Sequence, residues 1–328
     1  MNISSPYYRF RPIGSVEALG RALRTSPEAL RALAARSGSL YRVAKRIRKP
    51  DGSERVTYEA LGPLKLAHKR ILDILRRVEF PSYLMGGISN QGCTRGYIEN
   101  AHRHAGSAIL IQEDIANFFP SVSVDQVRRI FLHVCRFPPV VAQLLAELCT
   151  RAGAIPQGAA PSTHLANLVL YDEELCVASE LAALNLTYSR FIDDITVSSS
   201  VELPKSTVEL VVGRVRALVE REGFKVNRAK QSVSGRGTHH SVHRLNVSGA
   251  RATLPLKERK NIRASVKQLE NRAAAGRDME SFYQDWQRAM GRVGRFQSLH
   301  PVAGQVLKMR LRLVRASLVL QESAALPD

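Results

Sequence analysis

The stretch Phe191-Ile192-Asp193-Asp194 joins two segments that contain apolar and β-branched residues, 185–191 and 195–199. This pattern predicts a β-hairpin that carries two adjacent carboxylates at its tip. A third carboxylate, Asp114, follows the apolar run 108–111, which predicts a buried strand. Three carboxylates on neighbouring strand ends are the smallest donor set for two Mg²⁺ ions, and such metal pairs drive in-line displacement at phosphorus.

Each of these acidic residues has a structural explanation when it is taken alone. Aspartate is common in tight turns, so a turn role is the simpler interpretation of Asp193-Asp194 by itself. Asp114 by itself is consistent with a helix cap or a turn. The functional interpretation therefore depends on the rest of the chain.

The charge balance favours a polyanionic partner. The 328 residues include 48 Lys and Arg against 29 Asp and Glu, a net charge of +19 with a pI near 10.3. Neutralisation of phosphates releases counterions, so binding to nucleic acid would depend steeply on salt. The plainer alternative is a soluble cationic protein without such a partner.

Several features predict a cytoplasmic protein with no membrane partner. No apolar stretch reaches the length of a membrane span, and residues 1–12 lack a signal-peptide core. The cysteines show no CxxC spacing, so we expect reduced, buried thiols rather than disulfides or a zinc site. They are Cys93, Cys135, Cys149 and Cys176.

The order of the expected elements predicts a mixed α and β protein of two or three subdomains. A helix begins at Ser26-Pro27 and ends near Gly38, and a hairpin turns at Pro50-Asp51-Gly52. A helix with one apolar face begins at Pro63. Further helices are expected at 123–136, 138–151, 161–182, 206–222 and from 255 onward, with short strands near 224–226, 242–248 and 251–254.

Four blocks follow one another around the three carboxylates. They are Asp114-Ile115-Ala116-Asn117-Phe118-Phe119, then Gln157-Gly158 to Ser162 with Ala166-Asn167-Leu168, then Tyr188 to Asp194, and then Lys230 after Asn227. This ordered series resembles the palm of reverse transcriptases, and four ordered blocks are far more specific than any one of them. The resemblance implies an α+β right-hand polymerase fold with fingers, a palm made of a small antiparallel sheet plus helices, and a helical thumb.

Two further elements resemble retron reverse transcriptases. Asn100-Ala101-His102-Arg103-His104 matches their NAxxH element, and Val247-Ser248-Gly249 resembles their VTG element with Ser in place of Thr. The resemblance implies an N-terminal helical segment at 1–40, fingers and palm at 41–254, and a basic RNA-binding thumb at 255–328. The implied RNA-binding candidates are Asn100, His104, Val247, Ser248, Gly249, Lys257, Arg259, Lys260, Arg263 and Lys267.

Plainer alternatives exist for these candidates. His104 also fits a core histidine satisfied by backbone groups, and the basic stripe of the helix from Lys257 fits a solvated helix face.

The resemblance also implies roles at the active site. Asp114 and Asp193 would bridge two Mg²⁺ ions, with Asp194 and the Ile115 carbonyl as further ligands. The positions that differ from the family pattern are Phe191 and Ile192, which replace Tyr and a small residue before the Asp pair. A bulkier residue there is expected to slow the enzyme or alter its accuracy.

The remaining implied roles concern the incoming nucleotide. Lys49 and Arg55 would grip the triphosphate, although two solvated hairpin charges are the alternative. Phe119 would exclude a 2′-hydroxyl, with Phe118 as the alternative because one of the pair must point into the core. Gln157 and Gly158 would lie against the nascent base pair. Lys230 would protonate the leaving group or simply face phosphate.

Retron enzymes copy a cognate structured RNA from a 2′-hydroxyl on that RNA and yield branched RNA-linked DNA, called msDNA. The resemblance therefore implies dNTPs, the non-coding RNA and its msDNA, and an accessory effector protein in antiphage defence as partners. Another bacterial defence or diversity-generating reverse transcriptase is the first alternative. An RNA-dependent RNA polymerase is disfavoured by Phe119, and a catalytically inactive RNA-binding scaffold by the intact carboxylates.

Overall fold

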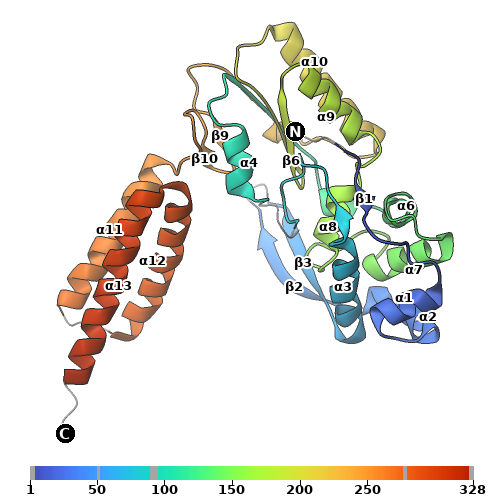
Figure 1. Ribbon diagram of the computed structural model, residues 1–328, viewed down its shortest axis with the longest axis horizontal. Coiled ribbons are helices and arrows are strands. Elements are labelled where there is room, and N and C mark those ends of the chain that lie inside the picture. The colour runs from blue at the N-terminus through green and yellow to red at the C-terminus, as the bar shows by residue number, and fades with distance from the viewer. Residues whose placement is uncertain (1–3, 50–51, 89–94, 276–278, 325–328) are drawn as a thin grey trace. The chain divides into compact units, whose positions relative to one another are not determined.

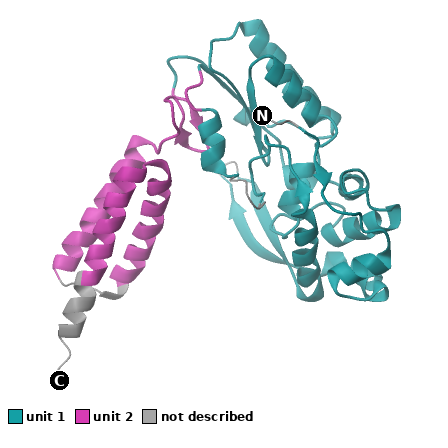
Figure 2. Ribbon diagram, viewed as in Figure 1, with its two compact units in different colours: residues 1–104, 108–238 teal, residues 105–107, 239–328 magenta. Residues whose placement is uncertain are grey.

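The computed structural model describes residues 4–49, 52–88, 95–275 and 279–324, with the backbone alone for 279–280 and 317–324. The chain divides into two compact units, drawn in teal and magenta in Figure 2. Unit 1 comprises residues 1–104 and 108–238, and unit 2 comprises residues 105–107 and 239–328. Each unit is described below by itself.

The centre of unit 1 is a four-stranded antiparallel sheet (Figure 1). Its strand order is β6-β7-β5-β8, with β6 at Thr187–Phe191, β7 at Asp194–Ser199, β5 at Ile109–Asp114 and β8 at Ser232–Ser234. The predicted strand before Asp114 and the predicted hairpin are confirmed. β8 was not predicted, whereas the strand expected at 224–226 makes only a single bridge between Ile115 and Val226.

The two faces of this sheet differ because side chains alternate along a strand. Ile111, Ile195 and Val197 lie on the apolar face, which packs against α9 (Glu174–Ala183) and α10 (Lys205–Arg221). The opposite face is polar, and the paired residues Asp114 and Asp194, Gln112 and Thr196, and Ser189 share it. The carboxylates therefore lie on the face that the apolar core does not cover.

The N-terminal part of unit 1 follows the sequence pattern closely. A hairpin joins β2 (Tyr41–Arg48) to β3 (Glu54–Ala60), and the predicted turn residues Pro50 and Asp51 lie outside the described residues. The apolar face predicted for α3 (Gly62–Leu75) is buried as expected. Ser26 caps the predicted helix α2 (Pro27–Ala35). The unpredicted elements are α1 (Val16–Leu23), the 3-10 turn η1 (Ser37–Ser39), and the paired strands β1 (Tyr7–Tyr8) and β4 (Val78–Glu79).

The helices predicted at 123–136, 138–151 and 161–182 are shorter or divided in the structure. The helix expected at 161–182 divides into α8 and α9, and the one expected at 123–136 ends in a π-helical turn. Cys135 and Cys149 are buried as expected, Cys176 is exposed, contrary to the prediction, and Cys93 lies outside the described residues. The elements are α4 (Tyr97–Arg103), α5 (Phe118–Ser121), α6 (Val124–Arg129), η2 (Ile130–Val134), α7 (Pro139–Cys149), α8 (Ser162–Leu168) and η3 (Arg228–Lys230).

Unit 2 combines a small hairpin with three helices. The hairpin joins β9 (Ser241–Val242) to β10 (Leu245–Asn246). The helices are α11 (Leu256–Ala274), α12 (Met279–Leu299) and α13 (Pro301–Ala324), and they enclose a core that includes Val266, Phe296 and Leu311. The helical region begins at Leu256, as the sequence predicts, and unit 2 also contains the hairpin that precedes it. Within the described residues, no helix is both long and apolar enough to cross a membrane.

Candidate active site

The sheet register brings the three carboxylates together. Asp114 at the end of β5 lies directly opposite Asp194 at the start of β7. Asp193 occupies the turn between β6 and β7, and its carbonyl accepts a hydrogen bond of 3.0 Å from the Ile115 amide. Residues separated by about 80 positions in the sequence therefore meet at one edge of the sheet.

Burial and mutual repulsion of the three carboxylates favour the binding of a cation at this cluster. Burial, followed by the charges of Asp193 and Asp114, raises the pKa of Asp194 to about 7. Burial also raises the pKa of Asp193, with Asp114 adding to the effect and Lys230 and Arg55 opposing it. Like charges in a partly desolvated site disfavour one another's ionised forms. A bound cation would relieve that repulsion.

Lys230 supplies part of the missing positive charge. Its Nζ lies 2.7 Å from Asp114 Oδ2, and this hydrogen bond raises the pKa of Lys230. The Lys230 side chain is 57% exposed and that of Asp114 is 6% exposed, so the ammonium group can move towards solvent only if another cation compensates the buried carboxylate. An ammonium group thus contacts an oxygen that a divalent metal ion would use.

The donor set fits a hard divalent cation, which prefers carboxylate and carbonyl oxygens. Among the described residues, no three acidic, histidine or cysteine side chains are already grouped as ligands of one metal position. Asp114, Asp193 and Asp194 would have to close around the ion, and Lys230 would have to move off Asp114. The Ile115 carbonyl is the additional oxygen expected from the sequence, and Ile115 borders the same cavity.

A cavity of about 780 Å³ opens in front of the carboxylates. Asp114 and Asp193 form part of its wall together with Lys230. The sequence-predicted nucleotide residues that also line it are Lys49, Arg55, Phe118, Phe119 and Gln157. The volume lies within the range of pockets that hold drug-sized ligands. Residues from four separate blocks of the sequence therefore surround one cavity.

The two adjacent phenylalanines occupy different environments. Phe118 is only 2% exposed, and its ring packs edge-on against Phe224 with a centroid distance of 5.2 Å. Phe119 is partly exposed and borders the cavity. Phe118 is thus the core member of the pair, and Phe119 is the better candidate for a wall beneath the sugar.

The Gln157-Gly158 turn is joined to the N-terminal hairpin. The Tyr58 amide in β3 donates a hydrogen bond of 2.7 Å to the Gln157 carbonyl. Gly158 has φ +103, and a Cβ at that position would lie 2.8 Å from the Tyr58 carbonyl oxygen. Any other residue would force the hairpin away. Gly158 therefore permits a close approach, while Gln157 faces the cavity.

A buried ion pair that was not predicted supports the hairpin tip. The Arg190 and Glu174 side chains are 0% and 1% exposed, and they form two hydrogen bonds of 2.6 and 2.7 Å. Arg190 also donates to the carbonyls of Ile192 and Asn167 at 2.9 and 2.8 Å. The sequence did contain a signal for this pair. Arg190 occupies an inward position of a predicted strand, and a buried charge needs a partner.

Ile192 adopts an unusual backbone conformation. Its φ of 62° is in the left-handed region, which β-branched residues rarely occupy. The bulk of the Phe191-Ile192 pair is accommodated by Gly86, where an added Cβ would lie 2.8 Å from Ile192 Cγ1. Such strain is found where surrounding contacts enforce it, often at active sites.

The NAxxH element is buried beneath the polar face of the sheet. Asn100 and His104 are 0% and 1% exposed. The His104 ring bonds the hydroxyls of Ser189 in β6 and Ser198 in β7, both at 2.7 Å. His104 is thus a core histidine, and both of its ring nitrogens bond side-chain hydroxyls. Side chains buried this deeply offer no surface to RNA.

The RNA-binding candidates of unit 2 differ in accessibility. Val247 is buried, whereas Ser248 and Gly249 are exposed, and the Ser248 hydroxyl accepts a hydrogen bond from the His240 amide. Arg259 is half-buried. The exposed basic residues of α11 are Lys257, Lys260, Arg263 and Lys267.

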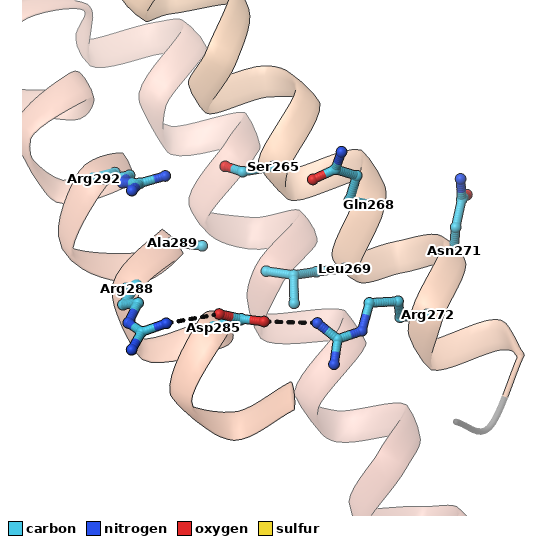
Figure 3. Close-up of a pocket in the computed structure, with 9 residues that line it drawn as sticks. All are labelled: Ser265, Gln268, Leu269, Asn271, Arg272, Asp285, Arg288, Ala289 and Arg292. Atoms are coloured by element: carbon cyan, nitrogen blue, oxygen red, sulfur yellow. Dashed lines mark hydrogen bonds and ion pairs between the residues drawn. The ribbon is translucent and has the colours of Figure 1, made fainter. Parts of the chain in front are cut away.

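A separate groove of about 490 Å³ lies between α11 and α12 (Figure 3). Arg272 and Arg288 both bond Asp285, at 2.7 and 3.1 Å, and Arg292 lies one turn further along α12. The sequence interpretation did not include these arginines. Their cationic character could be recognised from the sequence, but the groove requires the packing of two helices.

Comparisons with known proteins agree with this geometry. A family model described as "Reverse transcriptase (RNA-dependent DNA polymerase)" matches residues 47–248. The retron Se72 reverse transcriptase of Salmonella heidelberg (strain 579083-10) is 28% identical over 323 residues, which cover 97% of this chain and 83% of that protein. The retron Ec48 reverse transcriptase of Escherichia coli is 28% identical over 327 residues, which cover 96% and 80%.

Among solved structures, apo telomerase from Candida tropicalis, truncated from its C-terminal domain, aligns with a TM-score of 0.46. The identity is 11%, and the alignment covers 70% of this chain and 61% of that one. The family match, by contrast, spans more than half of the chain and includes every cavity residue named above. The chain therefore belongs to the reverse transcriptase family of RNA-directed DNA polymerases, and the relatives it resembles are retron enzymes.

Proposed function

We propose that this enzyme copies a cognate structured non-coding RNA into branched, RNA-linked single-stranded DNA, starting from a 2′-hydroxyl of that RNA. The proposal includes a role in antiphage defence with an accessory effector protein in the cytoplasm. The observation that supports it most strongly is the convergence of Asp114, Asp193 and Asp194 beside a cavity lined by Lys49 and Arg55. The naming of its relatives as retron enzymes supports the choice of template and product.

Two Mg²⁺ ions are the proposed cofactors. Asp114, Asp193, Asp194 and the Ile115 carbonyl would hold them. When bound, the metals lower the pKa of the attacking hydroxyl and neutralise charge on the leaving pyrophosphate. Lys230, whose raised pKa keeps it cationic, is suited to binding phosphate or protonating the leaving group once it leaves Asp114.

The cavity wall supports specific roles for its other residues. Lys49 and Arg55 would hold the triphosphate of a dNTP, because a guanidinium pairs with phosphate oxygens through two hydrogen bonds. Phe119 would exclude the 2′-hydroxyl of a ribonucleotide. Gln157 would contact the nascent base pair, with Gly158 allowing the close approach of β3.

Residues 41–254 are proposed as fingers and palm, following the N-terminal helical segment 1–40, and residues 255–328 as an RNA-binding thumb. The net charge of +19 supports binding to a polyanion. The exposed basic residues of α11 are the proposed phosphate contacts. His104 would act by holding β6 and β7 together rather than by touching RNA.

A primer-extension assay tests the polymerase mechanism. The template would be poly(rA) with an oligo(dT) primer, with dTTP and Mg²⁺, and the Asp193→Asn variant should lose nearly all incorporation. Asp125→Asn is the matched control, because Asp125 lies on α6 with its side chain 76% exposed. Equal activity of wild type and Asp193→Asn would contradict the two-metal assignment.

Sequencing the nucleic acid that co-purifies with the wild-type protein tests the retron product. A short single-stranded DNA joined to RNA is expected. Recovery of unbranched DNA copies alone would favour another bacterial defence or diversity-generating enzyme. Random cellular RNA with no DNA, together with full biological activity of an Asp193→Ala, Asp194→Ala variant, would favour an inactive RNA-binding scaffold.

A further inference from the structure

We infer that Arg151 is a phosphate-binding residue of the nucleotide cavity and that Tyr58 holds it in position. The ligand chemistry is phosphate oxygen, either from the triphosphate of the incoming nucleotide or from the backbone of the template strand. This inference rests on the proposed function of the cavity and adds a residue to it. Arg151 lies six positions before the Gln-Gly turn and belongs to none of the four sequence blocks.

The backbone around Arg151 is firmly set. Arg151 and Ala154 exchange hydrogen bonds of 2.8 and 3.2 Å around a two-residue turn in which Ala152 and Gly153 have φ of 51° and 81°. Two positive φ values in a two-residue hairpin loop are typical of a type I′ turn. The Gly153 carbonyl also accepts a hydrogen bond of 2.9 Å from Val124. Arg151 is therefore presented to the cavity from a rigid turn.

The side chain of Arg151 is held over an aromatic ring. Its guanidinium carbon lies 4.4 Å from the centroid of Tyr58, within the range of a cation–π interaction. Tyr58 is itself fixed, because its amide bonds the Gln157 carbonyl. Both residues line the 780 Å³ cavity that also contains Asp114 and Asp193. The guanidinium thus lies against β3 at the wall of this cavity.

The hydrogen-bonding state of Arg151 points to a ligand. Its Nε is buried and has no hydrogen-bond partner among the described residues. Within the same residues Arg151 forms no ion pair, whereas Lys230, another cation of the cavity wall, is paired with Asp114. Buried donors are almost always satisfied in folded proteins. A phosphate group offers the acceptors that a planar guanidinium fork requires.

A structural role alone is the competing explanation, in which Arg151 merely packs on Tyr58. The two explanations differ in what they predict for substrate binding. A phosphate ligand makes the affinity for dNTP or for template–primer depend on Arg151 even when the fold is intact. If Arg151 only packs on Tyr58, its substitution changes the stability of the protein but changes neither the affinity for dNTP nor the affinity for template–primer.

The experiment compares Arg151→Gln, Arg151→Lys and Tyr58→Leu with wild type and with Arg36→Gln. Arg36 is an exposed arginine at the end of α2, away from the cavity, and serves as the matched control. Three quantities are measured: the KM for dTTP on poly(rA)–oligo(dT), the Kd for that template–primer, and the thermal unfolding curve.

Arg151→Gln should raise one of the two binding constants roughly ten- to hundredfold, as expected for loss of hydrogen bonds between charged groups. A higher KM with an unchanged Kd identifies the triphosphate as the ligand. A higher Kd with an unchanged KM identifies the template backbone. Arg151→Lys should keep part of the affinity, and Tyr58→Leu should lose less than Arg151→Gln. Arg36→Gln should match wild type.

Binding constants equal to wild type in a folded, active Arg151→Gln protein would overturn the inference while leaving the polymerase assignment intact. Should Arg151→Gln fail to fold, a wild-type KM and Kd in both Arg151→Lys and Tyr58→Leu would overturn it equally. Absence of incorporation by the wild-type protein would instead count against the proposed function.

Discussion

The buried pair formed by Arg190 and Glu174 predicts a large and specific response to mutation. Glu174→Gln preserves the size of the side chain but removes its charge, so the Arg190 guanidinium is left uncompensated in the core. Breaking a buried ion pair by removing one partner typically costs about 3–5 kcal/mol. For a unit of this size, roughly 2–4 °C of Tm is lost per kcal/mol, so we expect a fall of roughly 6–20 °C.

The matched control is an exposed ion pair on the same helix. Glu180 in α9 bonds Arg214 in α10, and their side chains are 44% and 30% exposed. Glu180→Gln should cost less than about 1 kcal/mol, because exposed pairs contribute little to stability. The free energy of unfolding would be measured for both variants by urea denaturation at pH 7.

A double variant separates stability from catalysis. Glu174→Leu with Arg190→Met removes both charges, and apolar replacement of a whole buried pair is often neutral. We expect it to recover about half of the stability that Glu174→Gln loses. The kcat of the double variant should nevertheless be lower than that of wild type, with little change in KM. The reason is that the Ile192 carbonyl, next to Asp193, no longer accepts a hydrogen bond from Arg190.

Two results would refute this reasoning. One is a loss of less than about 1 kcal/mol in Glu174→Gln, since that would mean that the core compensates the lone guanidinium. The other is a wild-type kcat in the double variant, which would mean that the bond from Arg190 to Ile192 does not position the carboxylates.

Three further predictions concern single side chains. Phe119→Ala should raise the incorporation of rNTPs relative to dNTPs in primer extension, and an unchanged ratio would exclude Phe119 as the sugar wall. Burial, aided by Arg76, lowers the pKa of His164 to about 4, below its unfolded value near 6.5. Between these two pKa values the unfolded state binds a proton that the folded state does not bind. The free energy of unfolding is therefore at most roughly 3 kcal/mol higher above pH 6.5, and this difference is lost as pH falls towards 4. Urea unfolding at pH 7 and 4.5 should show this loss in wild type and a smaller one in His164→Gln. Ile192 also packs against the core, so the strain is tested by comparing two truncations: Ile192→Gly should be more stable than Ile192→Ala by roughly 1 kcal/mol, because only the alanine keeps the left-handed strain. A Tm of the glycine variant equal to or below that of the alanine variant would contradict the strain argument.

Local patterns in the sequence predicted much of unit 1 correctly. The strand ending at Asp114, the hairpin around Asp193-Asp194 and the apolar face of α3 depend on periodicity, caps and turn residues within short windows. The expectation that one of Phe118 and Phe119 lies in the core also follows from the local chain direction. Such features need only neighbouring residues.

The predictions that were wrong or incomplete concern burial and long-range partners. Cys176 was expected inside, but the face of α9 that carries it is exposed. β8 is too short to produce a recognisable pattern, and it exists because β5 offers an edge for pairing. The partners of His104 lie 85 and 94 residues further along the chain, so no local pattern identifies them.

The sequence by itself determined the alternating strands, the amphipathic helices and the identity of the acidic and basic side chains, because each depends on composition and spacing along the chain. Only the tertiary structure decided that Asp114 faces Asp194, that Arg151 lies over Tyr58, and that Glu174 neutralises Arg190. These contacts join segments that are far apart in the chain, and the packing of β-sheet and helices selects them from many possible pairings. Charge placement in a low-dielectric interior is therefore a property of the fold rather than of any short stretch of sequence.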